Sequence, residues 1–444
     1  MLRRTAAAPA QRISAQAAAA LVRSDMWVDY SGCLSQPDAF DRELALRVGE
    51  LSRVGVRSTL SMRARAVLEA DPEGQHICAY SLHFSGYDRR KHDAGITTYL
   101  PSNLGEIADY YRRFIPPVDI LVLKARPVDE TGTFNLGPTS IWNRAIIERA
   151  KCVIVEECAA MPYAVGEDNN LHISEVDYII PGDGQPLPEL PKSPATDVDR
   201  AVARLIMGEL EDGSCLQIGI GGMPNAVCTL LADSSIRDLG VHTEMLTDGI
   251  VDLYHKGLIT GSRKTLNPGK IVYTFTAATQ GTYDTVDSNP DFLCCAVDYT
   301  NLPHMIMQND RMVAINNTTQ VDLQGQAASE SDGHRHISGT GGQAQFVRGA
   351  YASKGGKSFI CLSSTYDKKG TRKSRIELSL TRGNICTTTR SDMMYVVTEY
   401  GIVNLKGKSV AERATALISI AHPDFREELA REARENRLIP RGFF

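Results

Sequence analysis

The chain has 444 residues, a formal net charge of -5, 43% hydrophobic residues and 23% charged residues. This length predicts two or three domains, each large enough to bury its own core, and excludes a small protein held together by disulfides or metal. The composition is that of a folded globular protein, and the acidic charge argues against broad binding to nucleic acid or to an anionic membrane.

The N-terminal segment allows two interpretations. Residues 1–25 are rich in alanine and arginine and contain no acid before Asp25, as in a mitochondrial transit peptide. The same segment fits a first helix through residues 15–24, capped by Ser14, with Leu21 and Val22 on its buried face. We favour the helix, because the chain runs into a strand-like segment without a cluster of small residues for cleavage. No apolar run in the sequence approaches the roughly 20 residues that a membrane span requires.

Apolar strand-like runs alternate with helical periodicity along most of the chain. One helical stretch, 200–213, ends in Gly213 just before such a run. Buried strands that alternate with helices predict α/β architecture with largely parallel sheets. The predicted strands are 118–124, 152–156, 215–220, 271–275, 312–315, 358–362 and 395–398.

A proline-rich segment marks the clearest linker. Five prolines fall between Pro181 and Pro194, and such a run favours neither helix nor strand. The sequence therefore predicts two α/β domains, residues 1–195 and 196–444.

The ten cysteines are scattered, mostly beside apolar residues, and form no CxxC motif. This pattern is typical of reduced, buried cysteines in a cytoplasmic protein. We therefore expect a cytoplasmic location and no redox role for these thiols.

Two glycine-rich turns are candidate binding sites. The first, Gly219–Asn225, follows a predicted strand and precedes a helix, so its backbone N–H groups can approach a phosphate or an oxyanion. It is neither a GxGxxG motif nor a P-loop, and a tight turn without a ligand stays an alternative. The second, Gly339–Gln343, is followed by Lys354 and Lys357. It formally matches GxGxxA, but the acid of a Rossmann NAD site is absent from the next strand.

A third motif places Glu244 in a short segment after the first glycine turn. A carboxylate at the carboxyl end of a strand can act as general base or nucleophile, although a lone glutamate in a loop is more often a surface residue. Other chemistries fit less well: Ser338 lacks the flanking glycines of a serine-hydrolase elbow, and His334 and His336 have no nearby third ligand for a metal. We expect no metal site.

Several motifs in the same order as in a known family make the chain resemble the acetyl-CoA hydrolase/transferase family, above all its 4-hydroxybutyrate and butyrate:acetate CoA-transferases. The resemblance covers nearly the whole chain. It implies a fold of two open α/β domains of the CoA-transferase (NagB/RpiA-like) type with mainly parallel sheets. The motifs lie at 118–140, 216–227, 241–257, 297–304, 315–326, 337–350 and 396–425.

The resemblance also implies roles for individual residues. The family's nucleophilic glutamate corresponds to Glu244, and its oxyanion-stabilising groups correspond to the Asn301 amide and the Gly342 N–H. Gln36 stands in a loop near the acyl pocket where many members carry glutamate, which leaves the acyl preference open. The implied CoA-binding positions are Gly219, Ile220, Gly221, Gly222, Met223, Gly341 and Lys354.

The implied reaction moves CoA between a short-chain acyl-CoA and a carboxylate, through an acyl-glutamyl anhydride and a glutamyl-CoA thioester. CoA is then a substrate and part of a covalent intermediate, and no other cofactor is expected. Acetate, propionate, butyrate and 4-hydroxybutyrate all fit as the acid. The resemblance further implies a homo-oligomer, a dimer. An acyl-CoA hydrolase is the alternative activity, and a non-catalytic CoA-binding protein is a minor one.

Overall fold

A computed structural model describes residues 4–442 of the chain. The residues form two compact units. The first unit contains the chain up to Pro191 together with Glu244–Thr247 and Val272–Thr300, and the second contains Lys192–Thr243, Asp248–Ile271 and the chain from Asn301 onward. The chain first passes from the first unit to the second between Pro191 and Lys192, within the proline-rich linker. A domain boundary at residue 195 stays a prediction, because two later segments of the chain pack with the first unit.

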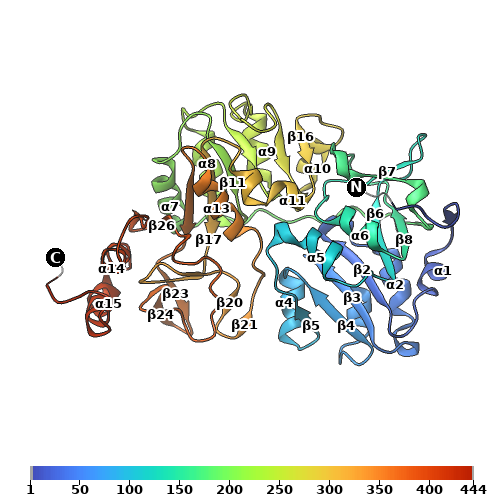
Figure 1. Cartoon of the computed structure of the whole chain (residues 1–444), viewed down its shortest axis with the longest axis horizontal. Helices are drawn as coiled ribbons and strands as arrows, with labels where there is room; N and C mark the ends of the chain where they lie inside the picture. Colours follow the sequence, from blue (N-terminus) through green and yellow to red (C-terminus); the bar gives the residue numbers. More distant parts are fainter. Residues whose placement is uncertain (1–3, 443–444) are drawn as a thin grey trace. The chain divides into compact units, whose positions relative to one another are not determined.

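The first unit is built on an eight-stranded sheet with the order β1-β10-β8-β6-β2-β3-β4-β5 (Figure 1). Every neighbouring pair in this sheet is parallel. The strands are β1 (Gln11–Arg12), β2 (Trp27–Gly32), β3 (Val54–Thr59), β4 (Ile77–Ser81), β5 (Thr97–Tyr99), β6 (Ile120–Ala125), β8 (Cys152–Glu157) and β10 (Tyr178–Pro181).

Helices cover both faces of this sheet, because its strands are apolar on both sides. Leu121 and Leu123 of β6 pack in a cluster with the buried residues of α5 and α6, and Ile120 and Val122 pack with those of α1 to α4. This alternation along one strand makes the sheet the middle of three layers. The helices are α1 (Ala15–Ala19), α2 (Ala39–Ala45), α3 (Ala66–Glu69), α4 (Gly86–Asp93), α5 (Ile107–Arg113), α6 (Asn143–Arg149), α10 (Gln280–Val286) and α11 (Val297–Thr300).

Smaller elements complete the first unit. Strands β7 and β9 form a separate antiparallel pair outside the main sheet, and β13 pairs in parallel with β15. The strands are β7 (Thr133–Asn135), β9 (Asn170–His172), β13 (Met245–Leu246), β14 (Ile271–Tyr273), β15 (Phe275–Thr276) and β16 (Phe292–Cys294). The 3-10 turns are η1 (Cys33–Ser35), η2 (Val48–Glu50), η3 (Leu104–Glu106), η4 (Glu167–Asn169) and η5 (Ile173–Glu175).

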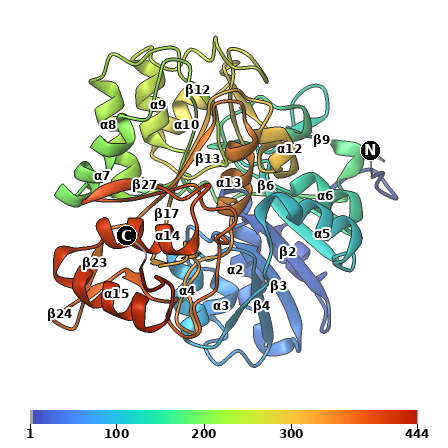
Figure 2. The same cartoon turned by 60° about the vertical axis from the view of Figure 1, so that its left-hand side comes forward.

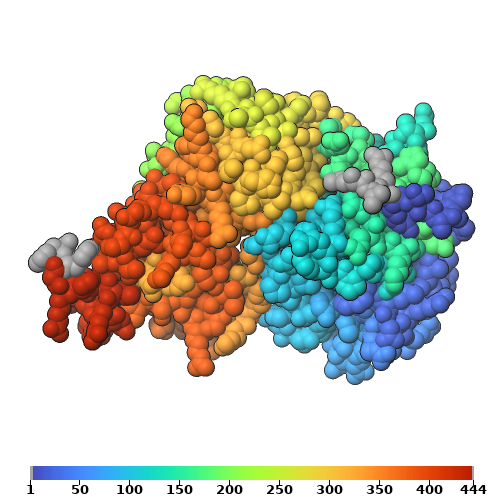
Figure 3. Space-filling model, in the orientation of Figure 1, coloured from blue at the N-terminus to red at the C-terminus, as the bar shows by residue number. Residues whose placement is uncertain are grey.

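The second unit contains the strand order β12-β11-β17-β22-β26-β27. The pairs are parallel except for β26 with β27, which is antiparallel. Figure 2 shows α7 and α8 side by side, and Figure 3 shows the red side chains of α14 and α15 on the surface of this unit. The strands are β11 (Cys215–Ile218), β12 (Gly240–His242), β17 (Met312–Asn317), β22 (Lys357–Cys361), β26 (Tyr395–Thr398) and β27 (Gly401–Asn404).

The remaining elements of the second unit are helices and short strand pairs. The helices are α7 (Asp197–Met207), α8 (Gly222–Ala232), α9 (Asp248–His255), α12 (Pro303–Ile306), α13 (Gln343–Ala352), α14 (Val410–Ser419) and α15 (Pro423–Glu435). The short strands are β18 (Gln320–Asp322), β19 (Ala327–Ala328), β20 (Ser331–Asp332), β21 (Arg335–His336), β23 (Thr365–Lys368), β24 (Thr371–Ser374) and β25 (Ile376–Glu377).

The α/β architecture and the mainly parallel sheets are confirmed, and each predicted strand corresponds to a strand of the structure. Only the strand at 395–398 keeps the predicted bounds, and each of the others begins or ends one or two residues away from them. The strand from Cys215 ends at Ile218, because the glycines that follow leave the extended conformation, and the run 271–275 divides into β14 and β15 at Thr274. No helix within residues 4–442 is long and apolar enough to cross a membrane.

The first helix and the cysteines also differ in detail from the prediction. Ser14 caps α1 by accepting a hydrogen bond from the Ala17 N–H, but the helix ends at Ala19 instead of continuing toward residue 24. Val22 is nonetheless fully buried. All ten cysteines are free thiols, as predicted, and most are buried, but Cys78 is exposed.

Candidate active site

Glu244 lies in a bend between β12 and β13 and belongs to the first unit. Its side chain is partly buried. The Glu244 carbonyl oxygen accepts hydrogen bonds from the N–H groups of Thr274 (3.0 Å) and Phe275 (3.3 Å). A further hydrogen bond joins the same two segments: the Thr276 hydroxyl donates to the Leu246 carbonyl oxygen at 2.9 Å. The backbone that carries the candidate nucleophile is therefore held on one side by the segment Thr274–Thr276.

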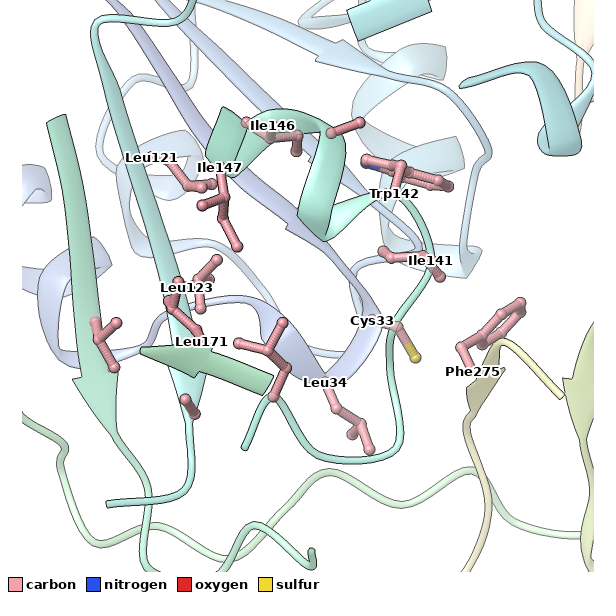
Figure 4. Close-up of a cluster of buried hydrophobic side chains, with 14 of the residues drawn as sticks. Cys33, Leu34, Leu121, Leu123, Ile141, Trp142, Ile146, Ile147, Leu171 and Phe275 are labelled. Atoms are coloured by element: carbon pink, nitrogen blue, oxygen red, sulfur yellow. The ribbon is translucent and has the colours of Figure 1, made fainter. Parts of the chain in front are cut away.

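The loop that follows β2 packs against the same segment. The Cys33 thiol lies 3.3 Å from the Thr276 carbonyl oxygen, to which it donates a hydrogen bond, and Figure 4 shows Cys33 facing Phe275. Burial raises the pKa of the Cys33 thiol to about 12, so this sulfur stays protonated and unreactive near neutral pH. Gln36 follows directly after the 3-10 turn η1, in the loop that the resemblance places near the acyl pocket.

Gln36 is almost fully buried, and the orientation of its side chain is well defined. Its Nε2 donates to the Thr59 carbonyl oxygen at 2.9 Å and lies 3.3 Å from the Ser61 hydroxyl. Because a carbonyl oxygen only accepts, the Gln36 amide nitrogen must face Thr59. The Gln36 Oε1 atom has no hydrogen-bond partner in the described part of the chain.

The first glycine turn leads from β11, which ends at Ile218, into α8, which begins at Gly222, in the second unit. Gly221 has φ 123° and ψ -179°, a conformation that is essentially restricted to glycine. Ile220 is 53% exposed, whereas Met223 is buried in the first turn of α8. The turn thus presents the N–H groups at the start of an 11-residue helix, which is a suitable place for an anionic ligand.

The second glycine turn leads into α13 and is braced by a buried carboxylate. Gly341 has a left-handed φ of 59°, and Gly342 is the residue that precedes α13. Within the turn, the Thr340 hydroxyl donates to Glu330 at 3.1 Å, and the Thr387 hydroxyl donates to the other Glu330 oxygen at 2.9 Å. Burial raises the pKa of Glu330, and the two hydroxyls offset part of that rise.

Within the second unit, both glycine turns lie at the carboxyl edge of the sheet. The Gly219 N–H donates to the carbonyl oxygen of Ile315, late in β17 (3.2 Å), and the Asn317 side chain lies 3.5 Å from the Ile220 carbonyl oxygen. The ring of His242, at the end of β12, lies 6.5 Å from the ring of Phe346 in the first half of α13. The structure therefore brings the two predicted glycine turns to one edge, as ligand sites of open parallel sheets require.

Asn301 is fully buried and belongs to the second unit. It lies between α11, which ends at Thr300, and α12, which begins at Pro303 and packs against α13. Helices α12 and α13 pack closely at Gly349, where an added Cβ would lie 2.5 Å from the Cβ of Ile306. The amide predicted to stabilise the oxyanion is therefore an interior group whose backbone is anchored by a tight helix contact.

Lys354 lies at the opposite edge of the sheet from the glycine turns. It follows α13, precedes β22 and is exposed. Its carbonyl oxygen accepts from the N–H of Arg311, the residue before β17 begins, whereas the first glycine turn contacts Ile315 and Asn317 in the second half of β17. The structure does not bring Lys354 together with the other predicted CoA-binding residues.

Sequence reasoning missed Glu330 and Asn317, which brace the two turns. No local pattern marks them, since their roles depend on contacts across the fold. The structure holds no cluster of three or more potential metal ligands among the residues it describes.

Two family descriptions match the chain. Residues 3–191 match the acetyl-CoA hydrolase/transferase N-terminal domain, and residues 278–433 match the C-terminal domain of the same family. The butyryl-CoA:acetate CoA-transferase of Anaerostipes caccae is 43% identical over 432 residues, which cover 97% of each chain. An acetyl-CoA hydrolase of Kluyveromyces lactis is more distant, with 28% identity over 247 residues, 53% of this chain and 45% of that one.

Solved structures agree with this similarity over the whole fold. RipA from Yersinia pestis has a TM-score of 0.87 and 36% identity, covering 97% of this chain and 98% of its own. The 4-hydroxybutyrate CoA-transferase of Porphyromonas gingivalis has a TM-score of 0.80 and 33% identity, covering 96% of this chain and 98% of its own.

Proposed function

The chain belongs to the acetyl-CoA hydrolase/transferase family, and we propose that this acyl-CoA:carboxylate CoA-transferase uses Glu244 to move CoA from a short-chain acyl-CoA to an acceptor such as acetate. The observation that carries the proposal is the placement of Glu244: a partly buried carboxylate whose backbone carbonyl accepts two N–H groups from the neighbouring segment. Butyryl and 4-hydroxybutyryl groups are the proposed acyl groups, by similarity to the relatives named above.

The chemistry follows from the carboxylate. A Glu244 oxygen attacks the thioester carbonyl, the C–S bond breaks, and an acyl-glutamyl anhydride and CoA thiolate form. The thiolate then attacks the glutamyl carbonyl and releases the first acid, which leaves a glutamyl-CoA thioester. The acceptor carboxylate attacks this thioester, and the same steps in reverse yield the new acyl-CoA and free Glu244. No proton is transferred in any of these steps.

The tetrahedral intermediates carry negative charge on oxygen, which donors must stabilise. We assign this role to the Asn301 side-chain amide and the Gly342 N–H. Both groups are buried; in such surroundings a hydrogen bond to an oxyanion is stronger than in water. The close packing of α12 on α13 supports the assignment, because donors that are already fixed need little reorganisation during the reaction.

We propose that CoA binds along Gly219–Met223 and Gly341, at the carboxyl edge of the second unit. Backbone N–H groups at the start of α8 are suited to its phosphates. The net charge of -5 does not attract such an anionic ligand, so local donors have to supply the binding. Lys354 is the weakest member of the predicted set, because it lies at the other edge of the sheet.

Trapping the thioester tests the nucleophile directly. Incubation with butyryl-CoA, reduction with borohydride and peptide mapping should show modification of the segment that contains Glu244. Glu244→Ala should lose both the modification and transfer to acetate. Glu148→Gln is a matched control, since Glu148 is also a poorly exposed carboxylate of the first unit and pairs with Arg112. Modification of any other segment would contradict the mechanism.

The hydrolase alternative differs in the second half of the reaction, where water replaces the acceptor. Release of free CoA without an acceptor, at a rate that matches transfer, would favour hydrolysis. The transferase predicts that CoA release depends on acceptor concentration and follows ping-pong kinetics.

We also propose a cytoplasmic location, supported by the ten free cysteines, and a homodimer, supported by the family resemblance alone. Sedimentation of the purified protein at micromolar concentration tests the second of these.

A further inference from the structure

Three non-glycine residues with positive φ gather beside the segment that holds Glu244. Ser31 has φ 56°, Cys33 has φ 53° and Ile141 has φ 36°. Such angles are uncommon for residues with a side chain, and a β-branched residue such as Ile141 is a genuine outlier. The segment that contains Ser31 and Cys33 touches the turn that contains Ile141, since a Cβ placed on Gly32 would lie 3.3 Å from the Ile141 Cδ1 atom. Figure 4 shows Cys33 and Ile141 on neighbouring segments, with Phe275 facing them.

The side chain of Asn143 connects these two segments. Asn143 is fully buried. Its Nδ2 donates to the Thr139 carbonyl oxygen at 2.8 Å and to the Ser35 hydroxyl at 3.1 Å, and its Oδ1 accepts from the Ser31 hydroxyl. The Thr139 carbonyl oxygen only accepts, so it fixes which end of the amide faces it. One amide thus holds both the loop after β2 and the turn before α6.

The turn held by Asn143 is linked to Glu244 through successive backbone hydrogen bonds, first to Thr274 and then from Thr274 to Glu244. The N–H groups of Ser140 (2.9 Å) and Ile141 (3.3 Å) donate to the Thr274 carbonyl oxygen. The Thr274 N–H in turn donates to the Glu244 carbonyl oxygen at 3.0 Å. All of these residues belong to the first unit. The position of the Glu244 backbone therefore depends on a turn that would not keep its strained shape without a clamp.

We infer that Asn143 is a positioning residue for Glu244: its amide holds the strained residues 31–33 and 139–141 in the shape that sets the place of the Glu244 carboxylate. The inference rests on the proposed function, in which Glu244 is the nucleophile. Asn143 acts through the backbone and does not touch the substrate. It lies three residues beyond the motif at 118–140 and received no role from the family resemblance.

A positioning role has a kinetic signature. A reactive group displaced by about 1 Å can lose about 100-fold in rate, while binding elsewhere stays intact. The proposed CoA-binding turns lie in the second unit, so the KM for acyl-CoA should not change. We expect Asn143→Ala to lower kcat, and the single-turnover rate of glutamyl-CoA thioester formation, by about 10- to 100-fold. KM should stay within about twofold of the wild-type value.

A matched variant separates positioning from general loss of stability. Ile154 on β8 is fully buried in the first unit and packs in the cluster of α1 to α4. Ile154→Ala should lower the thermal midpoint at least as much as Asn143→Ala does, with kcat within about twofold of wild type. If Asn143→Ala does not fold, Ser35→Ala replaces it, since it removes one of the three amide contacts, and a fall in kcat of about threefold or more is expected.

The inference is overturned if the folded Asn143→Ala or its substitute Ser35→Ala keeps wild-type kcat and single-turnover rate, or if Ile154→Ala loses kcat to the same extent. Glu244→Ala distinguishes this failure from failure of the proposed function. If the Glu244→Ala variant still transfers CoA, Glu244 is not the nucleophile, and the positioning role of Asn143 is then wrong as well. If Glu244→Ala is inactive while Asn143→Ala is fully active, only the positioning role is wrong.

Discussion

Gly221 is the position where the conformation of the backbone and the binding of CoA can be tested together. It connects β11 to α8 with φ 123° and ψ -179°. A Cβ at this position would meet only ordinary contacts, 3.5 Å from the Asn317 Nδ2 atom and 3.9 Å from the Pro224 Cδ atom. The change Gly221→Ala therefore fits sterically, and its effect comes from the backbone conformation alone.

The size of the effect follows from that conformation. A residue with a side chain in this region of φ and ψ is destabilised by about 1–3 kcal/mol. If the turn keeps its shape, the free energy of unfolding falls by this amount. If the turn relaxes, the N–H groups at the start of α8 move, and the same energy appears as about 5- to 150-fold weaker binding of acyl-CoA.

The assay compares thermal midpoints and the KM for acyl-CoA in Gly221→Ala and in the control Gly257→Ala. Gly257 follows α9 with a left-handed φ of 71° and has no atom within 4 Å of an added Cβ. Its substitution should lower stability by about 1–2 kcal/mol and leave KM unchanged. The expectation is wrong if Gly221→Ala neither lowers the free energy of unfolding by about 1 kcal/mol or more nor raises the KM for acyl-CoA by about fivefold or more.

Three further predictions address pH, CoA and packing. Burial raises the pKa of Asp41 to about 6, so the carboxyl group of Asp41 binds a proton more tightly in the folded state than in the unfolded state. At pH 7 the ionised Asp41 carboxylate therefore destabilises the fold by about 3 kcal/mol. The Asp41→Asn variant should therefore unfold at a higher urea concentration than wild type at pH 7.5, and this difference in urea midpoint should shrink as the pH falls from 6 toward 4. An equal difference at pH 7.5 and at pH 4 would contradict the raised pKa of Asp41. Lys354→Ala should leave the KM for acyl-CoA within about twofold, because Lys354 lies at the amino edge of the sheet, and a tenfold rise would show that CoA reaches that edge. Gly349→Ala should lower the unfolding free energy by about 1–3 kcal/mol through the 2.5 Å approach to Ile306, and Ile306→Ala in the same chain should recover part of the loss.

Local patterns in the sequence determined the class of fold and most of the elements. Apolar runs such as 152–156 and 312–315 became central strands of the two sheets, because burial on both faces requires uninterrupted apolar residues. Ser14 and the glycines of the first turn marked element ends, since caps and positive φ values depend on a few neighbouring residues. The motifs around Glu244, Asn301 and Gly342 carried the resemblance to the family, and the family itself is confirmed.

Tertiary structure alone decided which of these residues lie together. Lys354 and Gly341 are 13 positions apart in the sequence, yet α13 carries the chain from one edge of the sheet to the other between them. Glu244 belongs to the first unit, although residues on both sides of its segment belong to the second. The contact of Asn143 with Ser31 joins residues separated by 112 positions, and Glu330 meets Thr387 across 57. Hydrogen bonds of this kind leave no periodic trace in the sequence, because they depend on where the strands bring distant turns rather than on local conformation.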